Sequence, residues 1–281
     1  MKTSARIAAL ILSGTILSAS IMNAVPRGRP DPRFVQPEQI DPAQGVEVLD
    51  AFRSARTAGD YIFHFVMENR PHKGKSETIT GTMAGTWNAR GEAVTRCDLY
   101  MTREIVHLLY QGGIDGKIYK ASNEGQAALL DDDATQQPIA DGLTFTPFEL
   151  QMPFLFWTDY VYEGTKKLLG RPAHYFILYP PDNFEHPEIC AVRVAIDADF
   201  MVMLMAEELG SDGQAIKEFR INGFKKIDGQ WIVKEIDLVD RQSKNRSRFK
   251  VIEADVALDL AESIFNIAPE GNLAPIPALG E

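Results

Sequence analysis

Few side chains in this sequence stand at spacings that support catalysis or metal binding. The five histidines are scattered, and His64 and His107 each lie in a run typical of a β-strand, where a surface or hydrogen-bonded histidine is the common role. Residues 131–133 are three aspartates without the alternating oxygen ligands of a calcium loop, which favours a solvated loop. No hydrolase, zinc, redox or nucleotide-binding motif occurs. We therefore expect no catalytic residue, no metal and no other cofactor.

The two cysteines, Cys97 and Cys190, have two interpretations. As a pair they would form a disulfide suited to an oxidising compartment. Each also lies in a strand-like run, which is equally consistent with two buried free thiols. The sequence leaves both interpretations open, because it does not show how closely the two Cα atoms approach.

Large apolar side chains are concentrated in two places, residues 145–162 and residues 201–205. The second segment reads Met-Val-Met-Leu-Met, which in a strand places three methionines on one face. Methionine adapts to varied apolar partners, so the segments fit either an ordinary core or the lining of a ligand cavity. The residues that we expect to line such a cavity are Phe63, Phe65, Phe148, Met152, Phe154, Phe156, Trp157, Met201, Met203 and Met205.

Composition and charge exclude some classes of protein. The chain has 281 residues, 45% of them hydrophobic, and a formal net charge of −10. Residues 1–24 contain two basic residues and no acidic one, so 27 basic and 39 acidic residues remain, a charge of −12. This acidity argues against a protein that binds nucleic acid through its phosphates, or an anionic membrane surface through charge. The apolar content argues against disorder and for a large core.

The first 24 residues have the pattern of an export signal. A short basic start, Met1 to Arg6, precedes the apolar run IAALILSGTILSASIM and a small residue, Ala24. We expect cleavage near Ala24 and a soluble, exported protein. No cysteine stands at the new N-terminus, so we expect no lipoprotein-type acylation.

The remaining chain predicts a mainly β protein with few helices. An extended proline-rich arm covers residues 25–42, and apolar spacing predicts a helix over 43–58. Eleven alternating runs from residue 61 to residue 258 predict consecutive antiparallel strands, with Asp-Gly pairs at two of the turns. Between the two groups of strands lie a polar loop, 122–146, and a helical stretch that Thr146 caps and Pro153 splits.

These elements predict one domain, residues 43–267, followed by a C-terminal tail, 268–281. The absence of β-helix-β alternation argues against a parallel sheet, so these elements predict one large, strongly curved antiparallel sheet whose inner face the helical stretches cover. Two helical stretches cover little of so large a concave face. We therefore expect an apolar cavity under a helical lid.

The second half resembles the LolA-like outer-membrane lipoprotein-sorting proteins. The resemblance rests on the order of three segments: VYEGTKKLLGRPAHYFIL with a Gly-Arg-Pro-Ala turn, VRVAIDADFMVMLMAEELGSDGQAIKEFRINGFKKIDGQWIVKEIDLVD, and SRFKVIEADVALDLAESIF, which ends at Phe265. The resemblance covers about 110 contiguous residues clearly and the first half of the chain more loosely.

This resemblance implies the fold class, an incomplete antiparallel β-barrel that forms a curved half-barrel covered by helices. It also implies a periplasmic carrier without enzymatic activity. Its cavity would hold the acyl chains of a lipoprotein or another lipid, taken from an inner-membrane donor protein and passed to an outer-membrane acceptor. It also implies that a helix arginine, Arg53 or Arg56, latches the lid to the barrel. Two alternatives remain: an envelope-stress sensor on the same fold, and a secreted hydrolase whose site the sequence does not reveal.

Overall fold

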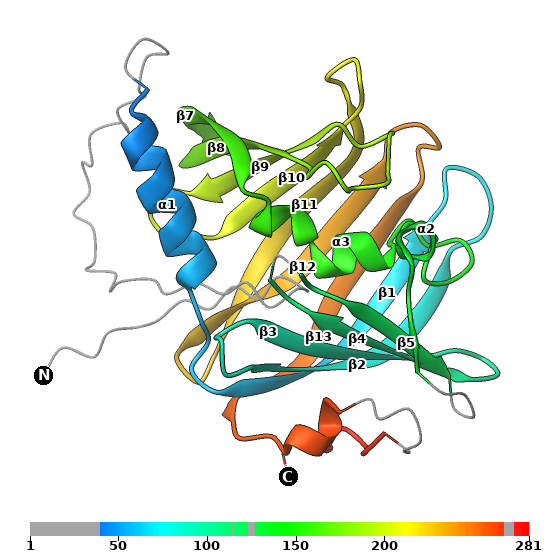
Figure 1. The fold of residues 1–281 in the computed structure, drawn as a ribbon. Helices are drawn as coiled ribbons and strands as arrows, with labels where there is room; N and C mark the ends of the chain where they lie inside the picture. Colours follow the sequence, from blue (N-terminus) through cyan, green and yellow to red (C-terminus); the bar gives the residue numbers. More distant parts are fainter. Residues whose placement is uncertain (1–39, 114, 123–126, 267–272, 281) are drawn as a thin grey trace, which may run out of the picture.

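One strongly curved antiparallel sheet forms most of the molecule (Figure 1). The computed structural model describes residues 40–113, 115–122, 127–266 and 273–280. The predicted signal peptide and all but the end of the proline-rich arm lie outside these ranges. The strands are β1 (Asp60–Arg70), β2 (Glu77–Trp87), β3 (Ala93–Tyr100), β4 (Ile105–Gln111), β5 (Ile118–Ser122), β6 (Ala128–Leu129), β7 (Asp159–Leu168), β8 (Arg171–Tyr179), β9 (Ala191–Asp197), β10 (Met203–Leu209), β11 (Ala215–Ile227), β12 (Gln230–Asp240) and β13 (Arg246–Leu258).

The predicted fold class is confirmed: the sheet is an open, curved antiparallel half-barrel with few helices. All eleven strands predicted from the alternation are present. The structure adds β6, and it adds β7 as the strand that the family resemblance implies before the Gly-Arg-Pro-Ala turn. The predicted second helical stretch ran on to Tyr160, but β7 already begins at Asp159. Residues of β7 are largely exposed or half-buried because this strand forms an edge of the sheet. Its weak apolar alternation explains why the sequence pattern did not reveal it.

The order of the strands explains why a segment must cross the concave face. The sheet runs β6-β5-β4-β3-β2-β1-β13-β12-β11-β10-β9-β8-β7, so β6 and β7, consecutive in the chain, form its opposite edges. The chain between them, residues 130–158, contains the short helices α2 (Asp132–Thr135), α3 (Pro147–Gln151) and η2 (Pro153–Phe156). Figure 1 shows α3 lying across the hollow of the sheet. We call residues 145–157 the lid.

Bulges and glycines curve the sheet. The pairing register shifts within five strand pairs, among them β1–β13 and β10–β11. Such shifts bend and twist strands. On β2, Gly81 and Gly85 stand directly opposite Phe65 and Tyr61. A Cβ atom at either glycine would lie within 2.5 Å of the facing ring, so both large rings rest on bare backbone.

The first helix, α1 (Pro42–Ser54), lies beside β7 at one side of the opening (Figure 1). Asp41 caps its N-terminus by accepting a hydrogen bond from the Ala43 N–H, and the helix buries Leu49 and Phe52. The predicted helix over 43–58 is therefore four residues too long at its C-terminal end. Arg56 Nη1 donates to the carbonyl oxygens of Arg53 and Ala55, and these bonds satisfy the end of the helix before Gly59. In the described part of the chain, no helix is long and apolar enough to cross a membrane.

Close packing of α1 on β7 predicts the effect of a small substitution at Gly45. An added Cβ atom there would lie 2.7 Å from Tyr162 Cβ. Alanine favours helices over glycine by about 1 kcal/mol, but overpacking typically costs about 1–3 kcal/mol. We expect Gly45→Ala to lower the free energy of unfolding in urea, while Glu47→Ala at an exposed position of the same helix has little effect. Stabilisation by Gly45→Ala would show that α1 is not closely seated.

The lid begins and breaks where the sequence predicts. Thr146 caps α3 with Pro147 at the first position, and the Thr146 N–H donates to Glu149 Oε2 at 2.6 Å. The helix ends at Gln151, Met152 adopts a left-handed conformation (φ 54°), and a 3₁₀ turn begins at Pro153. Pro153 therefore splits the stretch as expected, because a proline cannot donate the backbone hydrogen bond that would continue the helix.

The end of the chain packs against the convex face. Ile264, Phe265, Ile276 and Leu279 cover Ile62 and Ala84 on the outside of β1 and β2. Arg96, only 2% exposed, donates to the carbonyl oxygens of Ile264 and Ala274 and forms an ion pair with Asp98. Cys97 is buried and Cys190 exposed, and the two thiols are free rather than bonded to each other.

Candidate functional site

The interior of the half-barrel is one continuous apolar core. Tyr61, Phe63, Phe65 and Met67 alternate along β1 and all point into it. Seven of the ten residues predicted to line a cavity are buried in this core: Phe63, Phe65, Phe148, Met152, Phe154, Trp157 and Met203. Phe156 and Met201 are partly buried against it. Sequence reasoning therefore found residues that the fold brings together.

The predicted face of three methionines is wrong. Met201 lies in the turn between β9 and β10 with a φ of 53°, before β10 begins. Met203 is paired with Ile196 and faces the core. A bulge follows, so Met205 pairs with Ala195 and lies in a separate cluster with Ala173 on the other face of the sheet. The extra residue in the bulge reverses the alternation that the sequence pattern assumes.

Aromatic rings fill the space beneath the lid. The ring centroids of Phe148 and Phe154 are 5.9 Å apart, and that of Trp157 lies 6.4 Å from Phe154. Phe184, from the loop after β8, joins this cluster at 5.1 Å from Trp157. Phe145 meets Phe219 of β11 edge to face at 6.5 Å. The lid thus contributes its own side chains as the filling of the concave face.

Arg53 connects α1 to the lid. Its Nε donates to the Leu155 carbonyl oxygen at 2.6 Å and its Nη2 to the Trp157 carbonyl oxygen at 2.6 Å. Burial lowers the pKa of this guanidinium, although Asp50 partly opposes the shift. Of the two candidate arginines, only Arg53 is hydrogen-bonded to the lid among the described contacts; Arg56 lies 4.7 Å above the Trp87 ring instead.

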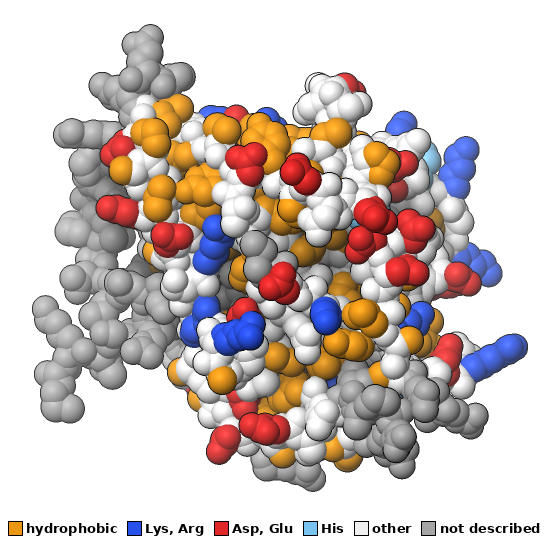
Figure 2. Space-filling model, viewed as in Figure 1, with side chains coloured by type: hydrophobic (Ala, Val, Ile, Leu, Met, Phe, Trp, Pro, Cys, Tyr) orange, Lys and Arg blue, Asp and Glu red, His pale blue; other side chains and the backbone are white. Residues whose placement is uncertain are grey.

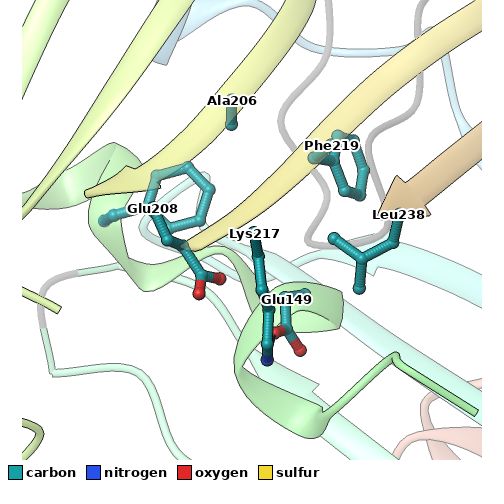
Figure 3. Close-up of a pocket in the computed structure, with 7 residues that line it drawn as sticks. Glu149, Ala206, Glu208, Lys217, Phe219 and Leu238 are labelled. Carbon is teal, nitrogen blue, oxygen red and sulfur yellow. Dashed lines mark hydrogen bonds and ion pairs between the residues drawn. The ribbon is translucent and has the colours of Figure 1, made fainter. Parts of the chain in front are cut away.

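A buried charged cluster holds the other side of the lid (Figure 3). Glu149 of α3 is 2% exposed and forms an ion pair with Lys217 of β11, and Glu208 of β10 lies beside them. Burial, and then the neighbouring Glu149, raise the pKa of Glu208 to about 8, although Lys217 opposes the shift. Burial opposes the charge of Lys217, but the two carboxylates outweigh it and raise the pKa of this ammonium group. The raised pKa favours the neutral carboxyl form of Glu208 at pH 7.

Little free space remains at this contact. The cavity between the lid and strands β10–β12 has a volume of about 10 Å³, which is about the space for one water molecule. Its lining is formed by Glu149, Phe154, Ala206, Glu208, Lys217, Phe219 and Leu238. In this closed form an acyl chain does not fit beneath this part of the lid, contrary to the cavity expected there. A ligand would have to displace the lid.

Sequence reasoning missed the Glu149–Lys217–Glu208 cluster. Glu149 stands three residues after Thr146, a spacing that indicates a helix cap but no contact with a distant strand. Strand alternation from Met203 would place Glu208 on the opposite face, and the bulge before Met205 turns it inward. No signal in the sequence reveals that bulge.

The outer surface offers no basic patch in the view of Figure 2. Hydrophobic side chains gather over α1 and the neighbouring edge of the sheet, where Val46 and Val161 are about half exposed. Lys and Arg side chains are dispersed over this face. This face therefore offers no charged site, and the buried aromatic cluster makes the lidded interior the candidate site.

The open, curved half-barrel matches the LolA-like fold, as comparisons with solved structures show. A putative outer membrane lipoprotein-sorting protein domain from Vibrio parahaemolyticus superposes with a TM-score of 0.65 at 14% identity, covering 80% of this chain and 94% of that one. A LolA superfamily protein from Nitrosomonas europaea gives a TM-score of 0.58 at 14% identity, with 80% and 97% covered.

Further comparisons agree on the fold and add no specific activity. A DUF1329 family protein from Desulfovibrio piger superposes with a TM-score of 0.69 at 13% identity, covering 80% of this chain and 96% of that one. A protein-family model described only as an uncharacterized protein matches residues 157–268. No curated protein matches the sequence. The resemblance read from the sequence is thus confirmed for the fold.

Proposed function

We propose that this chain is an exported, periplasmic carrier that binds the acyl chains of a lipoprotein, or of another lipid, in its lidded interior. It performs no covalent chemistry. It receives its cargo from an inner-membrane donor and releases it to an outer-membrane acceptor. The observation that carries this proposal is the lid itself: an aromatic filling of the concave face that polar contacts, Arg53 on one side and Lys217 on the other, hold in place.

The free energies of burial and hydrogen bonding support an exchange in which a ligand takes the place of the lid. Burial of an acyl chain contributes about 0.8 kcal/mol per methylene, so a dozen methylenes contribute about 10 kcal/mol. Hydrogen bonds to charged groups contribute about 1.5–3 kcal/mol each. A chain entering the interior therefore offsets the loss of the Arg53 and Lys217 contacts, and its departure allows the lid to close again. Reversible binding is what a carrier requires.

Bound lipid in the native protein tests this proposal. We expect protein purified without detergent from its native compartment to release acylated material on organic extraction, identified by mass spectrometry. Phe154→Ala, which removes a lid ring from the interior, should increase the amount bound. Leu169→Ala, at a position that is 81% exposed, is the control and should leave it unchanged. Protein recovered empty, with no rise in Tm when acyl lipids are added, would refute the carrier.

A further inference from the structure

A second apolar space lies away from the lid, where strands β10 and β11 separate. Their pairing runs only from Leu209↔Ala215 to Met205↔Arg220. Beyond Arg220, β11 continues to Ile227 paired with β12 alone, and bulges near Gly223 bend this hairpin. A pocket of about 360 Å³ occupies the resulting gap. We call it the wedge pocket; its lining is formed by Arg171, Asp197, Phe200, Val202, Leu204, Phe224 and Trp231.

The wall formed by the β9–β10 turn is well fixed. The Asp197 N–H donates to the Val202 carbonyl oxygen at 2.7 Å, and Asp197 Oδ1 accepts from the N–H groups of Asp199 and Phe200 at 2.9 Å. Above this turn the Arg171 guanidinium lies 4.5 Å from the centroid of the Phe200 ring. The pocket is thus formed before any ligand arrives, which lowers the entropic cost of binding.

The size of the wedge pocket limits what it holds. Pockets for small ligands have volumes of roughly 300–1,000 Å³ and mostly apolar walls. At about 360 Å³ the wedge pocket lies at the lower end of this range. Its walls are apolar except for Arg171 and Asp197. A single narrow hydrocarbon chain matches this volume and lining, whereas several chains packed side by side do not.

The charges at the pocket select the head group. Arg171 Nε donates to Asp197 Oδ2 in an ion pair in which Asp197 is 1% exposed and Arg171 43% exposed. The charge of Asp199 also acts on Arg171, so one positive charge faces two negative ones. An anionic head group would find the guanidinium already neutralised and would meet two carboxylates. An uncharged head group avoids this repulsion.

We infer that the wedge pocket binds the single unbranched hydrocarbon chain of an amphiphile with an uncharged head group. The wedge pocket borders the same apolar core, to which Val202 belongs, but it shares no lining residue with the cavity beneath the lid. It goes beyond the proposed function, since it needs no movement of the lid. The interior and the wedge pocket are thus two apolar sites of different size and access.

Calorimetry on the full chain with 1-monododecanoylglycerol, below the concentration at which it aggregates, tests the inference. We expect one site, with a Kd that falls about fourfold for each added methylene until the pocket is full. Dodecanoate should bind at least tenfold more weakly. Leu204→Trp, which fills the pocket, should abolish binding, and Leu169→Trp at an exposed position should not. Equal or tighter binding of dodecanoate would overturn the assigned head group.

Tryptophan quenching locates the chain independently of any destabilised variant. The sequence has three tryptophans: Trp231 lines the wedge pocket, Trp157 belongs to the lid, and Trp87 stacks with Arg56. A brominated acyl chain on glycerol should quench Trp231, so Trp231→Phe removes the effect and Trp157→Phe retains it. Arg53→Leu should not change it. Quenching of Trp157 instead would overturn the wedge pocket while supporting the lidded interior as the lipid site.

Discussion

Replacing Arg53 with leucine is expected to lower the free energy of unfolding by about 3 kcal/mol and to release the lid. The guanidinium donates to two lid carbonyl oxygens, Leu155 and Trp157, at 2.6 Å each. Hydrogen bonds from a charged donor contribute about 1.5–3 kcal/mol, and part of that is regained when the freed carbonyls reach water. Leucine keeps the packing of the side-chain stem but supplies no donor, so the lid loses its connection to α1.

Hydrogen exchange measures this release directly. In Arg53→Leu, the amides of residues 148–157 should exchange faster, and an apolar dye should bind to the newly exposed interior. Lysine retains the charge of Arg53 but cannot donate to both carbonyl oxygens in the same geometry. The lid amides of Arg53→Lys should therefore exchange at rates between those of wild type and Arg53→Leu. Arg103→Leu, on an exposed turn, provides the matched control. Unchanged exchange in the lid of Arg53→Leu would show that Arg53 does not hold it.

The second large effect is expected for Glu208→Gln, which should stabilise the protein above about pH 5. The pKa of Glu208 is raised from an ordinary 4.5 to about 8, by burial first and then by Glu149. Between these two pH values the folded state holds a proton that the unfolded state releases. The stabilisation is complete below pH 4.5 and is lost as the pH rises to 8. At pH 7 the loss amounts to at most about 3 kcal/mol.

Urea unfolding at several pH values tests whether stability falls as the pH rises. The wild type should lose stability steadily from pH 5 to pH 8, whereas Glu208→Gln should show a flatter profile. The groups that face Glu208 are Glu149 on α3 and Lys217 on β11, with Asp240 of β12 contributing more weakly. Glu207→Gln tests the adjacent position, where the carboxylate pairs with Arg193 on the other face, and should keep the wild-type slope. Parallel slopes for all three proteins would contradict the buried proton.

Most of the fold could be predicted because a strand that buries every second residue has a periodic pattern of apolar side chains in the sequence. On β1, Tyr61, Phe63 and Phe65 alternate with Ile62 and His64, and the structure preserves that alternation. The edge strand β7 has no such apolar pattern, because much of it faces solvent. The start of α3 could also be predicted, because Thr146 and Pro147 are typical of a helix N-terminus.

The candidate site was only partly predictable, because its contacts join distant residues. The lid aromatics were recognised by their density, yet the bonds from Arg53 span more than 100 residues. The wedge pocket depends on where β10 stops pairing with β11, and on bulges that shift the register by one residue. Neither the point where the β10–β11 pairing ends nor the position of these bulges is encoded in a local sequence pattern. Phe200 and Leu204 line it, where the methionine pattern pointed to Met201 and Met205.

The pairing of β1 with β13, at the centre of the sheet, limits how early the protein can fold. Residues 60–70 pair with residues 246–258, while the strands on either side follow one another in sequence. Each half is a meander that forms from local contacts, but within the sheet the two halves are paired only through these two strands. Contacts of such high sequence separation slow folding. During synthesis the join waits until residue 258 has emerged, so the chain stays open for most of its production. If residues 1–24 direct export, that delay keeps the chain in a form that can still be threaded across a membrane.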